Sequence, residues 1–329
     1  MKIVRAPLRI TLGGGGTDLP GWYSKNGGFL ICAAIDKYIY ATGSKRIYDN
    51  KIWLSYSKVE VCDFISEVKN ELFKKCLEKF NIPNGFELHS ISELPGSSGC
   101  GSSAAFLVAT LKLLSLMEQR SLTTKELAEL ACHIEMVELG QSSGKQDQYA
   151  SAFGGIISLT IDNQGEVTVA PLNLDNITCK HLHNNLLLYY SGISREANKI
   201  LKEQGQDIGG RNISAIKAMQ RIQEIGYESK ILLESGDLDE FGCLLHEHWE
   251  LKKSMSNKMS TPFIDETYKF AMDQGALGGK VMGAGGGGFF MFYVPAEKHN
   301  NFRRSMQQRN LKEMDWQFDH SGVTQVYTI

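Results

Sequence analysis

Clustered glycines constrain this 329-residue chain more than any other feature of its sequence. Most of its 33 glycines lie in four segments, at 13–16, 96–101, 140–155 and 275–288. Glycine permits tight turns and close approach of the backbone to a neighbour. Strands and helices are predicted between these segments, so the glycines mark turns of a folded core. We infer that the four segments surround one site.

The composition is that of a globular protein with a sizeable core. Hydrophobic residues make up 42% and charged residues 22%, and the length suits two domains or one large domain. The formal net charge of −2, without a basic tract, argues against a nucleic-acid partner. No apolar run approaches the roughly 18 residues of a membrane span. Seven cysteines without a CxxC pair are interpreted as buried thiols, and we expect a cytoplasmic protein without a membrane partner.

Hydrophobic patterns predict an α+β fold whose first half ends near residue 180. The expected domains are 1–180 and 181–329. Strands are predicted at 2–12, 29–40, 51–56, 86–91, 186–190, 279–283, 289–294 and near the C-terminus, with a hairpin over 152–169. Helices are predicted at 63–80, 102–119, about 124–140, 195–204, 211–226, 237–253 and 261–274.

Residues 95–104 join a loop of glycines and serines to the start of an apolar helix. Free N–H groups and the partial positive charge at a helix N-terminus bind phosphate well, and glycines allow close approach. Ser102 and Ser103 could add hydroxyl ligands to a phosphate or to a phosphate-bound Mg²⁺. The alternative is a tight loop followed by a serine-capped helix.

Two carboxylates lie at the third glycine segment. Glu135 lies on the preceding predicted helix and Asp147 lies within the segment. One could hold a metal ion while the other positions a nucleophile, which is the division of work in phosphoryl transfer. Alternatively, Glu135 is a solvated helix residue and Asp147 caps a turn.

The sequence leaves two roles open for each of the other two glycine segments. In 280–289, either two backbones pack closely or a ligand lies against the turn. In 7–18, Asp18 could accept hydrogen bonds from sugar hydroxyls or cap the next turn.

Competing motifs fail on spacing. Gly140 and Gly144 stand one residue too close for a Walker-type P-loop before Lys145. The loop at 96 lacks the parallel βαβ context of a dinucleotide fingerprint. His246-Glu247-His248 lacks the spacing of an HExxH zinc motif and is more typical of a helix surface.

Three segments together resemble the motifs of the GHMP kinases, which include galactokinase, homoserine kinase and mevalonate kinase. They are 9–18, PGSSGCGSSAA at 95–105 and VMGAGGGGFF at 281–290, and they follow the order and separations of the family. The resemblance spans nearly the whole chain. It implies a domain like domain 2 of ribosomal protein S5, then a ferredoxin-like domain, with ATP and a sugar in the cleft.

The resemblance also implies roles for individual residues. Asp147 falls where the family has its catalytic carboxylate, as a base or as an orienting group, and Arg9 matches the adjacent arginine of galactokinases. Ser103 and Glu135 would serve Mg²⁺. The ATP phosphates would contact Gly96, Ser97, Ser98, Gly99, Cys100, Gly101, Ser102 and Ser103. The sugar would contact Thr17, Asp18, Arg195, Gly285 and Gly286.

The details of these motifs point to a substrate. Segments 13–20, 144–155 and 190–197 resemble most the kinases of D-glycero-D-manno-heptose phosphates, followed by L-fucose kinase domains. Galactokinases have Gly-Glu-His-Thr-Asp where this chain has Gly-Gly-Gly-Thr-Asp at 14–18, which leaves room for a larger or phosphorylated sugar. Arg195 would clamp its phosphate, unless it only forms a surface salt bridge.

We therefore expect an ATP- and Mg²⁺-dependent kinase that phosphorylates a heptose phosphate, first of all on its anomeric hydroxyl, in the synthesis of nucleotide-activated heptose. Its expected partners are ATP and a small sugar phosphate. The alternatives are a kinase of L-fucose or another free sugar, and a catalytically silent sugar sensor on the same fold. A dinucleotide-dependent oxidoreductase ranks last.

Overall fold

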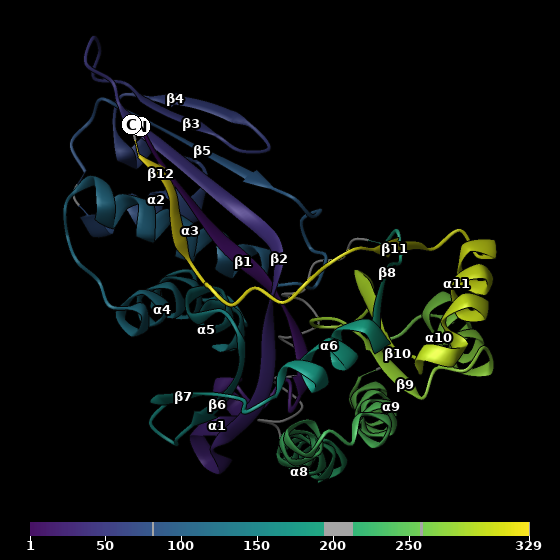
Figure 1. Ribbon diagram of the computed structural model, residues 1–329. Helices are drawn as coiled ribbons and strands as arrows, with labels where there is room; N and C mark the ends of the chain where they lie inside the picture. The colour runs from purple at the N-terminus through teal and green to yellow at the C-terminus, as the bar shows by residue number, and fades with distance from the viewer. Residues whose placement is uncertain (81, 194–212, 257–258, 329) are drawn as a thin grey trace.

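The computed structural model describes residues 1–80, 82–193, 213–256 and 259–328. Its elements form two separate β-sheets with helices packed on them, as Figure 1 shows. The α+β class predicted from the hydrophobic patterns is confirmed.

The larger sheet has the strand order β12-β1-β2-β5-β3-β4 in the described residues, with β6 and β7 attached through β2. Its long central strands are β1 (Lys2–Gly13) and β2 (Gly28–Lys45). From Ala6 onward every residue of β1 is buried, because several helices pack against this strand. The other strands are β3 (Ile52–Ser55), β4 (Val59–Cys62), β5 (Phe86–Ser92), β6 (Ile156–Ile161), β7 (Val167–Pro171) and β12 (Thr324–Thr328).

One face of this sheet is covered by the helix that follows the second glycine segment. This helix, α3 (Ser102–Met117), begins where predicted, directly after Gly101 in a left-handed conformation. It is apolar on all sides because it packs against β1 and β2 on one side and other helices on the other. Those neighbours are α2 (Glu71–Phe80), α4 (Thr124–Cys132) and α5 (Gln146–Phe153).

The predicted helix at 63–80 is wrong in its first part. A short 3₁₀ turn (Ile65–Glu67) ends in an extended Val68, and α2 begins only at Glu71. The carboxylate of Glu60 accepts the backbone N–H groups of Lys69 and Asn70. These local side-chain bonds compete with the helix and delay its start.

The smaller sheet is antiparallel in the order β11-β8-β10-β9. Its strands are β8 (Leu186–Tyr190), β9 (Gly278–Val281), β10 (Phe289–Tyr293) and β11 (Lys312–Met314). The remaining helices are α1 (Pro20–Asn26), α6 (Asn176–Asn185), α8 (Ile213–Ser235), α9 (Leu238–Met255), α10 (Pro262–Asp273) and α11 (His299–Gln308). The predicted helix 195–204 lies outside the described residues, and none of the described helices could cross a membrane.

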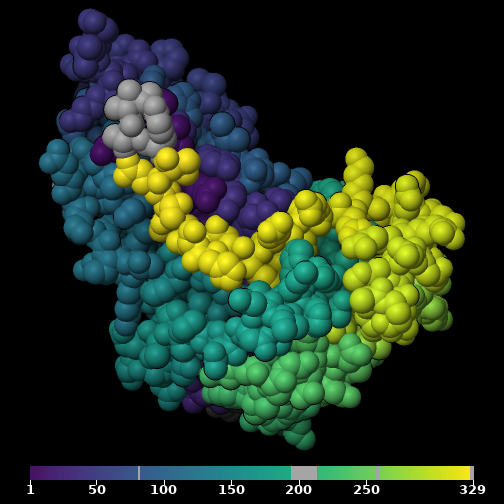
Figure 2. All heavy atoms as spheres, in the orientation of Figure 1, coloured from purple at the N-terminus to yellow at the C-terminus, as the bar shows by residue number. Residues whose placement is uncertain are grey.

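The end of the chain returns to the first sheet. Strand β12 pairs with β1, so that Lys2 lies opposite Thr328, and the two ends of the chain lie side by side. Figure 2 shows this last segment, in yellow, running over the surface from the second sheet to the first. Residues after 180 therefore contribute to both sheets, and the domain boundary at 180 stays a prediction.

The cysteines are free thiols, as expected. Five of them are buried, whereas Cys179 is partly exposed and Cys243 is exposed. The interpretation that all seven are buried is therefore wrong at these two positions.

Substitution of Gly242 tests how closely α9 packs on the second sheet. A Cβ at this position would lie 2.5 Å from the ring of Tyr293, whose hydroxyl bonds Asp239. Helix propensity alone favours alanine by about 1 kcal/mol. We expect Gly242→Ala instead to lower the free energy of unfolding by about 1–3 kcal/mol through overpacking, measured by urea denaturation.

The neighbouring exposed residue provides the control. Cys243 lies on the solvent side of α9, so Cys243→Ala should change the free energy of unfolding by less than about 0.5 kcal/mol. A Gly242→Ala protein as stable as the parent would contradict the close packing.

Candidate active site

A cavity of about 590 Å³ lies between the two sheets. Its walls come from the end of β1, the loop before α3, the start of α5, α9 and the turn between β9 and β10. Ten residues predicted from the sequence line it: Arg9, Asp18, Ser97, Ser98, Gly99, Gly101, Ser102, Ser103, Glu135 and Asp147.

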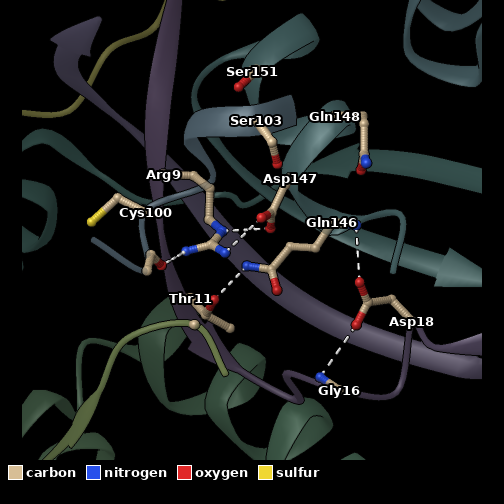
Figure 3. A network of polar contacts seen from close by, with 12 residues as sticks. Arg9, Thr11, Gly16, Asp18, Cys100, Ser103, Gln146, Asp147, Gln148 and Ser151 are labelled. Carbon is tan, nitrogen blue, oxygen red and sulfur yellow. Dashed lines mark hydrogen bonds and ion pairs between the residues drawn. The ribbon is translucent and has the colours of Figure 1, made fainter. Parts of the chain in front are cut away.

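An ion pair between Arg9 and Asp147 lies in this cavity (Figure 3). The guanidinium Nε and Nη2 atoms donate to the two carboxylate oxygens at 2.7 and 2.8 Å, and Nη1 donates to the carbonyl of Gly99. Arg9 is buried in β1, whereas the side chain of Asp147 is 29% exposed. Burial alone would lower the pKa of Arg9, but the charge of Asp147 and its hydrogen bonds raise it. The pair thus fixes the carboxylate while leaving it accessible from the cavity.

The loop before α3 curls around one end of the cavity. Ser97, Gly99 and Gly101 all have left-handed backbone angles, with φ of 59°, 82° and 81°. The first turn of α3 then presents Ser102 and Ser103. The hydroxyl of Ser102 is buried and has no hydrogen-bond partner among the described residues. A helix start with a free hydroxyl and unpaired N–H groups is suited to phosphate.

Glu135 lies close to this helix start. A π-helical turn (His133–Glu138) follows α4 and places the carboxylate in the interior, 3% exposed. The Ser103 hydroxyl donates to one carboxylate oxygen at 2.6 Å, and the amide of Gln148 donates to the other. Burial raises the pKa of Glu135 to about 7, while these hydrogen bonds act in the opposite direction. The alternative of a solvated helix residue is thereby excluded.

Asp18 joins the first glycine segment to α5. Its carboxylate accepts the N–H of Gly16 at 3.2 Å and that of Gln146 at 3.0 Å (Figure 3). Burial, together with the nearby charge of Asp147, raises the pKa of Asp18.

The contact between the second and fourth glycine segments shows the close packing of two backbones that the sequence left open, while Gly283 and Ala284 of the same turn also line the cavity. A Cβ on Gly99 would lie 2.5 Å from the carbonyl oxygen of Met282, and one on Gly283 would lie 2.8 Å from the Cα of Gly99. The turn between β9 and β10 therefore packs directly on the loop before α3, backbone against backbone. The second sheet is joined to the first at this point.

Five predicted residues do not line the cavity that the described residues form. Thr17 is fully buried, with its hydroxyl bonded to the backbone of neighbouring segments, and the Cys100 side chain points away from the Arg9 pair. Gly285 and Gly286 lie against Met259. Gly96 directly precedes the lining residue Ser97 but does not line the cavity itself. Arg195 lies outside the described residues.

Sequence reasoning missed other lining residues, above all Lys252 on α9 and Gln146 on α5. The Lys252 ammonium is buried and donates to the carbonyl of Gly283 at 2.8 Å. The sequence does contain a signal for Lys252, because this lysine shares a helix face with the apolar residues Leu245, Trp249 and Met255. A lysine on the buried face of an amphipathic helix is a candidate for a functional cation.

Comparison with known proteins agrees with this geometry. Residues 65–155 match the family model of the GHMP kinases N terminal domain, and 229–312 match that of the GHMP kinases C terminal domain. A D-glycero-alpha-D-manno-heptose 7-phosphate kinase of Campylobacter jejuni is 32% identical, over 98% of each chain. A bifunctional fucokinase/GDP-fucose pyrophosphorylase of Arabidopsis thaliana is 25% identical over 95% of this chain and 32% of its own.

Among solved structures, a D-glycero-D-manno-heptose 1-phosphate kinase from Bacteroides thetaiotaomicron has a TM-score of 0.83 and 27% identity over the full length of both chains. The fold is thus that of small-molecule kinases with two domains. The chain belongs to the GHMP kinase family of ATP-dependent kinases. The resemblance inferred from the three glycine motifs is confirmed.

Removal of Arg9 tests the central ion pair. We expect Arg9→Met to lower the free energy of unfolding by about 2–4 kcal/mol, because it removes the partner of Asp147 and leaves the Gly99 carbonyl unpaired. Chemical denaturation followed by circular dichroism measures the change.

Arg46 is the matched control, since it also makes paired hydrogen bonds to an aspartate but lies at the surface. Water screens such a pair, so Arg46→Met should lower the free energy of unfolding much less than Arg9→Met does. Equal losses of unfolding free energy in the two variants would show that the buried Arg9–Asp147 pair stabilises the fold no more than a surface pair does.

Proposed function

We propose that this protein transfers the γ-phosphoryl group of ATP to a hydroxyl of a D-glycero-D-manno-heptose phosphate, with the anomeric hydroxyl of the 7-phosphate as the acceptor. The observation that carries the proposal is the fixed but accessible Asp147 carboxylate between a phosphate-binding helix start and Asp18. The names of the two heptose kinases support this acceptor class and differ in the position of its phosphate.

The ATP phosphates would lie on the loop before α3. Gly99 and Gly101 let the backbone approach them, and the first turn of α3 offers N–H donors with the positive end of the helix dipole. The unpaired hydroxyl of Ser102 would gain a phosphate oxygen as its partner. This arrangement holds the transferred group at the end of the cavity near Asp147.

The donor set beside this loop fits Mg²⁺. This ion usually takes one or two carboxylates together with phosphate oxygens and waters. Glu135 is a buried carboxylate without an ion pair among the described residues, and Ser103 adds a hydroxyl 2.6 Å away. Ser103 and Glu135 would hold the ion, which would neutralise charge on the ATP phosphates.

Asp147 would act on the acceptor hydroxyl. In the transfer, the hydroxyl oxygen forms a bond to the γ-phosphorus, the bond to the bridging oxygen of ADP breaks, and the hydroxyl proton passes to the carboxylate. Arg9 holds both oxygens of Asp147 and aims the carboxylate at the cavity. The Arg9 cation would also offset negative charge that develops on the phosphoryl group.

Asp18 would accept hydrogen bonds from other hydroxyls of the sugar. Gly15 and Gly16 form the adjacent wall without side chains, so a seven-carbon sugar has more room there than a hexose would need. A silent sugar sensor is disfavoured because Arg9, Asp147 and Glu135 are all present and meet in one cavity.

An acceptor panel with Mg-ATP tests the proposal. We expect ADP release with D-glycero-D-manno-heptose 7-phosphate, and much lower rates with free heptose, L-fucose, galactose and mevalonate. Asp147→Asn should lower kcat with the heptose phosphate by about 10²–10⁴-fold, because the amide cannot take up the proton.

Asp175→Asn, an exposed cap of α6, controls for a general effect of losing a carboxylate and should leave kcat unchanged. Preferred turnover of L-fucose would keep the kinase site and replace the acceptor. An unchanged kcat in Asp147→Asn would show that Asp147 takes no part in the reaction.

The magnesium assignment has its own test. Glu135→Gln keeps the shape of the side chain and removes its charge, so we expect the Mg²⁺ concentration for half-maximal activity to rise roughly tenfold or more. Glu138→Gln is the control, because Glu138 lies on the same turn but bonds Lys79. An identical Mg²⁺ dependence in parent and Glu135→Gln proteins would place the metal elsewhere.

A further inference from the structure

Three basic side chains lie together at the side of the cavity formed by α9 and β9, and of these three only Lys252 lines the cavity itself. His248 and Lys252 stand one turn apart on α9, and Lys280 lies on β9, against which α9 packs. They are 1%, 8% and 3% exposed. The prediction that the His246-Glu247-His248 motif lies on a helix surface is therefore wrong for His248.

These groups lack the partners that buried basic groups normally have. Both ring nitrogens of His248 are buried, and in the described residues neither makes a hydrogen bond of ordinary geometry, although the ring lies next to the backbone of Gly15. Lys252 bonds only the carbonyl of Gly283 there, and neither lysine forms an ion pair with a carboxylate in the part of the chain that the structure describes. Unpaired cations in the interior are costly, so their retention points to an anionic ligand.

The electrostatics of the cluster agree with this. Burial and the charge of Arg9 together lower the pKa of Lys252 to about 8, whereas Asp18 and Asp147 act in the opposite direction. Burial also lowers the pKa of Lys280 well below its ordinary value, as does the neighbouring Lys252. A bound dianion would stabilise the charged form of both lysines.

We propose that Lys252, supported by Lys280 and His248, forms an anion subsite that binds the phosphate group the acceptor already carries. This inference rests on the proposed function and adds a binding site for one part of its substrate. A phosphate monoester carries nearly two negative charges, and it accepts hydrogen bonds from ammonium groups and from an imidazole N–H.

The position of the cluster favours the acceptor phosphate over the phosphates of ATP. ATP has its own binding groups at the start of α3, and Arg9 lies beside the carboxylate that receives the acceptor hydroxyl. His248, in contrast, lies beside the backbone of Gly15. Gly15 belongs to the wall without side chains, where the far end of a long sugar would lie. An acceptor with its hydroxyl at Asp147 and its phosphate at Lys252 would thus span the cavity.

Kinetics of a charge-removing variant of this chain test the subsite. Lys252→Met keeps the length of the side chain and removes the charge. We expect the KM for heptose 7-phosphate to rise roughly 10- to 100-fold, the gain typical of a hydrogen bond to a charged group, with a small change in kcat. The kcat/KM for free heptose should not fall, because this acceptor has no phosphate to lose a contact, and Lys280→Met should shift the KM for heptose 7-phosphate in the same direction as Lys252→Met.

Lys253→Met is the matched control, since Lys253 is the next residue of α9 and pairs with Glu250 on the outer side. It should leave both acceptors unaffected. An equal loss of kcat with both acceptors in Lys252→Met would overturn the proposal, because the lysine would then act on the transferred phosphoryl group. An unchanged preference for the phosphorylated acceptor would also overturn it.

Calorimetric titration with inorganic phosphate separates this inference from the proposed function. We expect phosphate to bind the parent and the Lys253→Met protein, and to bind Lys252→Met at least tenfold more weakly. Failure of the parent protein to phosphorylate any heptose phosphate would overturn the proposed function alone. Equal phosphate binding by the parent and Lys252→Met proteins would overturn the subsite.

Discussion

The backbone contact between Gly99 and Gly283 is the constraint on which the site depends. It allows the loop before α3, which belongs to the first sheet, to touch the turn between β9 and β10 of the second. Arg9 donates to the carbonyl of Gly99, and Lys252 donates to that of Gly283. Each side of the contact is thus held by a cation from its own half of the protein, and the cavity lies between the two. A side chain at either glycine would separate these walls.

The charges of the cavity are only partly balanced within the protein. Arg9 and Asp147 neutralise each other, whereas Glu135 and Lys252 are buried without ion-pair partners among the described residues. Burial shifts the pKa of Glu135 up to about 7 and that of Lys252 down to about 8. Such groups destabilise the free protein, and cations and phosphates that bind beside them offset this cost. The imbalance is therefore expected of a site that holds charged ligands.

Sequence reasoning succeeded where the determinants are local. The turn at Gly101 and the start of α3 follow from neighbouring residues, whereas the start of α2 was missed because Glu60, nine residues earlier, bonds Lys69. Arg9 and Asp147 are 138 positions apart, and only the family resemblance brought them together. The pairing of β12 with β1 depends on tertiary packing, which no local pattern encodes. The inward position of Lys252 was missed although the lysine shares a helix face with apolar residues.

The two halves of the protein would contribute different parts of acceptor recognition. Gly15 belongs to the first half and leaves room for a long sugar, since any longer side chain there would first meet Thr11 and then extend into the cavity. Lys252 belongs to the second half and would recognise charge. A sugar without phosphate could occupy the space beside Gly15 but would leave the lysine unpaired. The protein would then reject the unphosphorylated sugar because its binding leaves a buried cation without an anion. Such an unpaired group discriminates between ligands more strongly than a difference in their size.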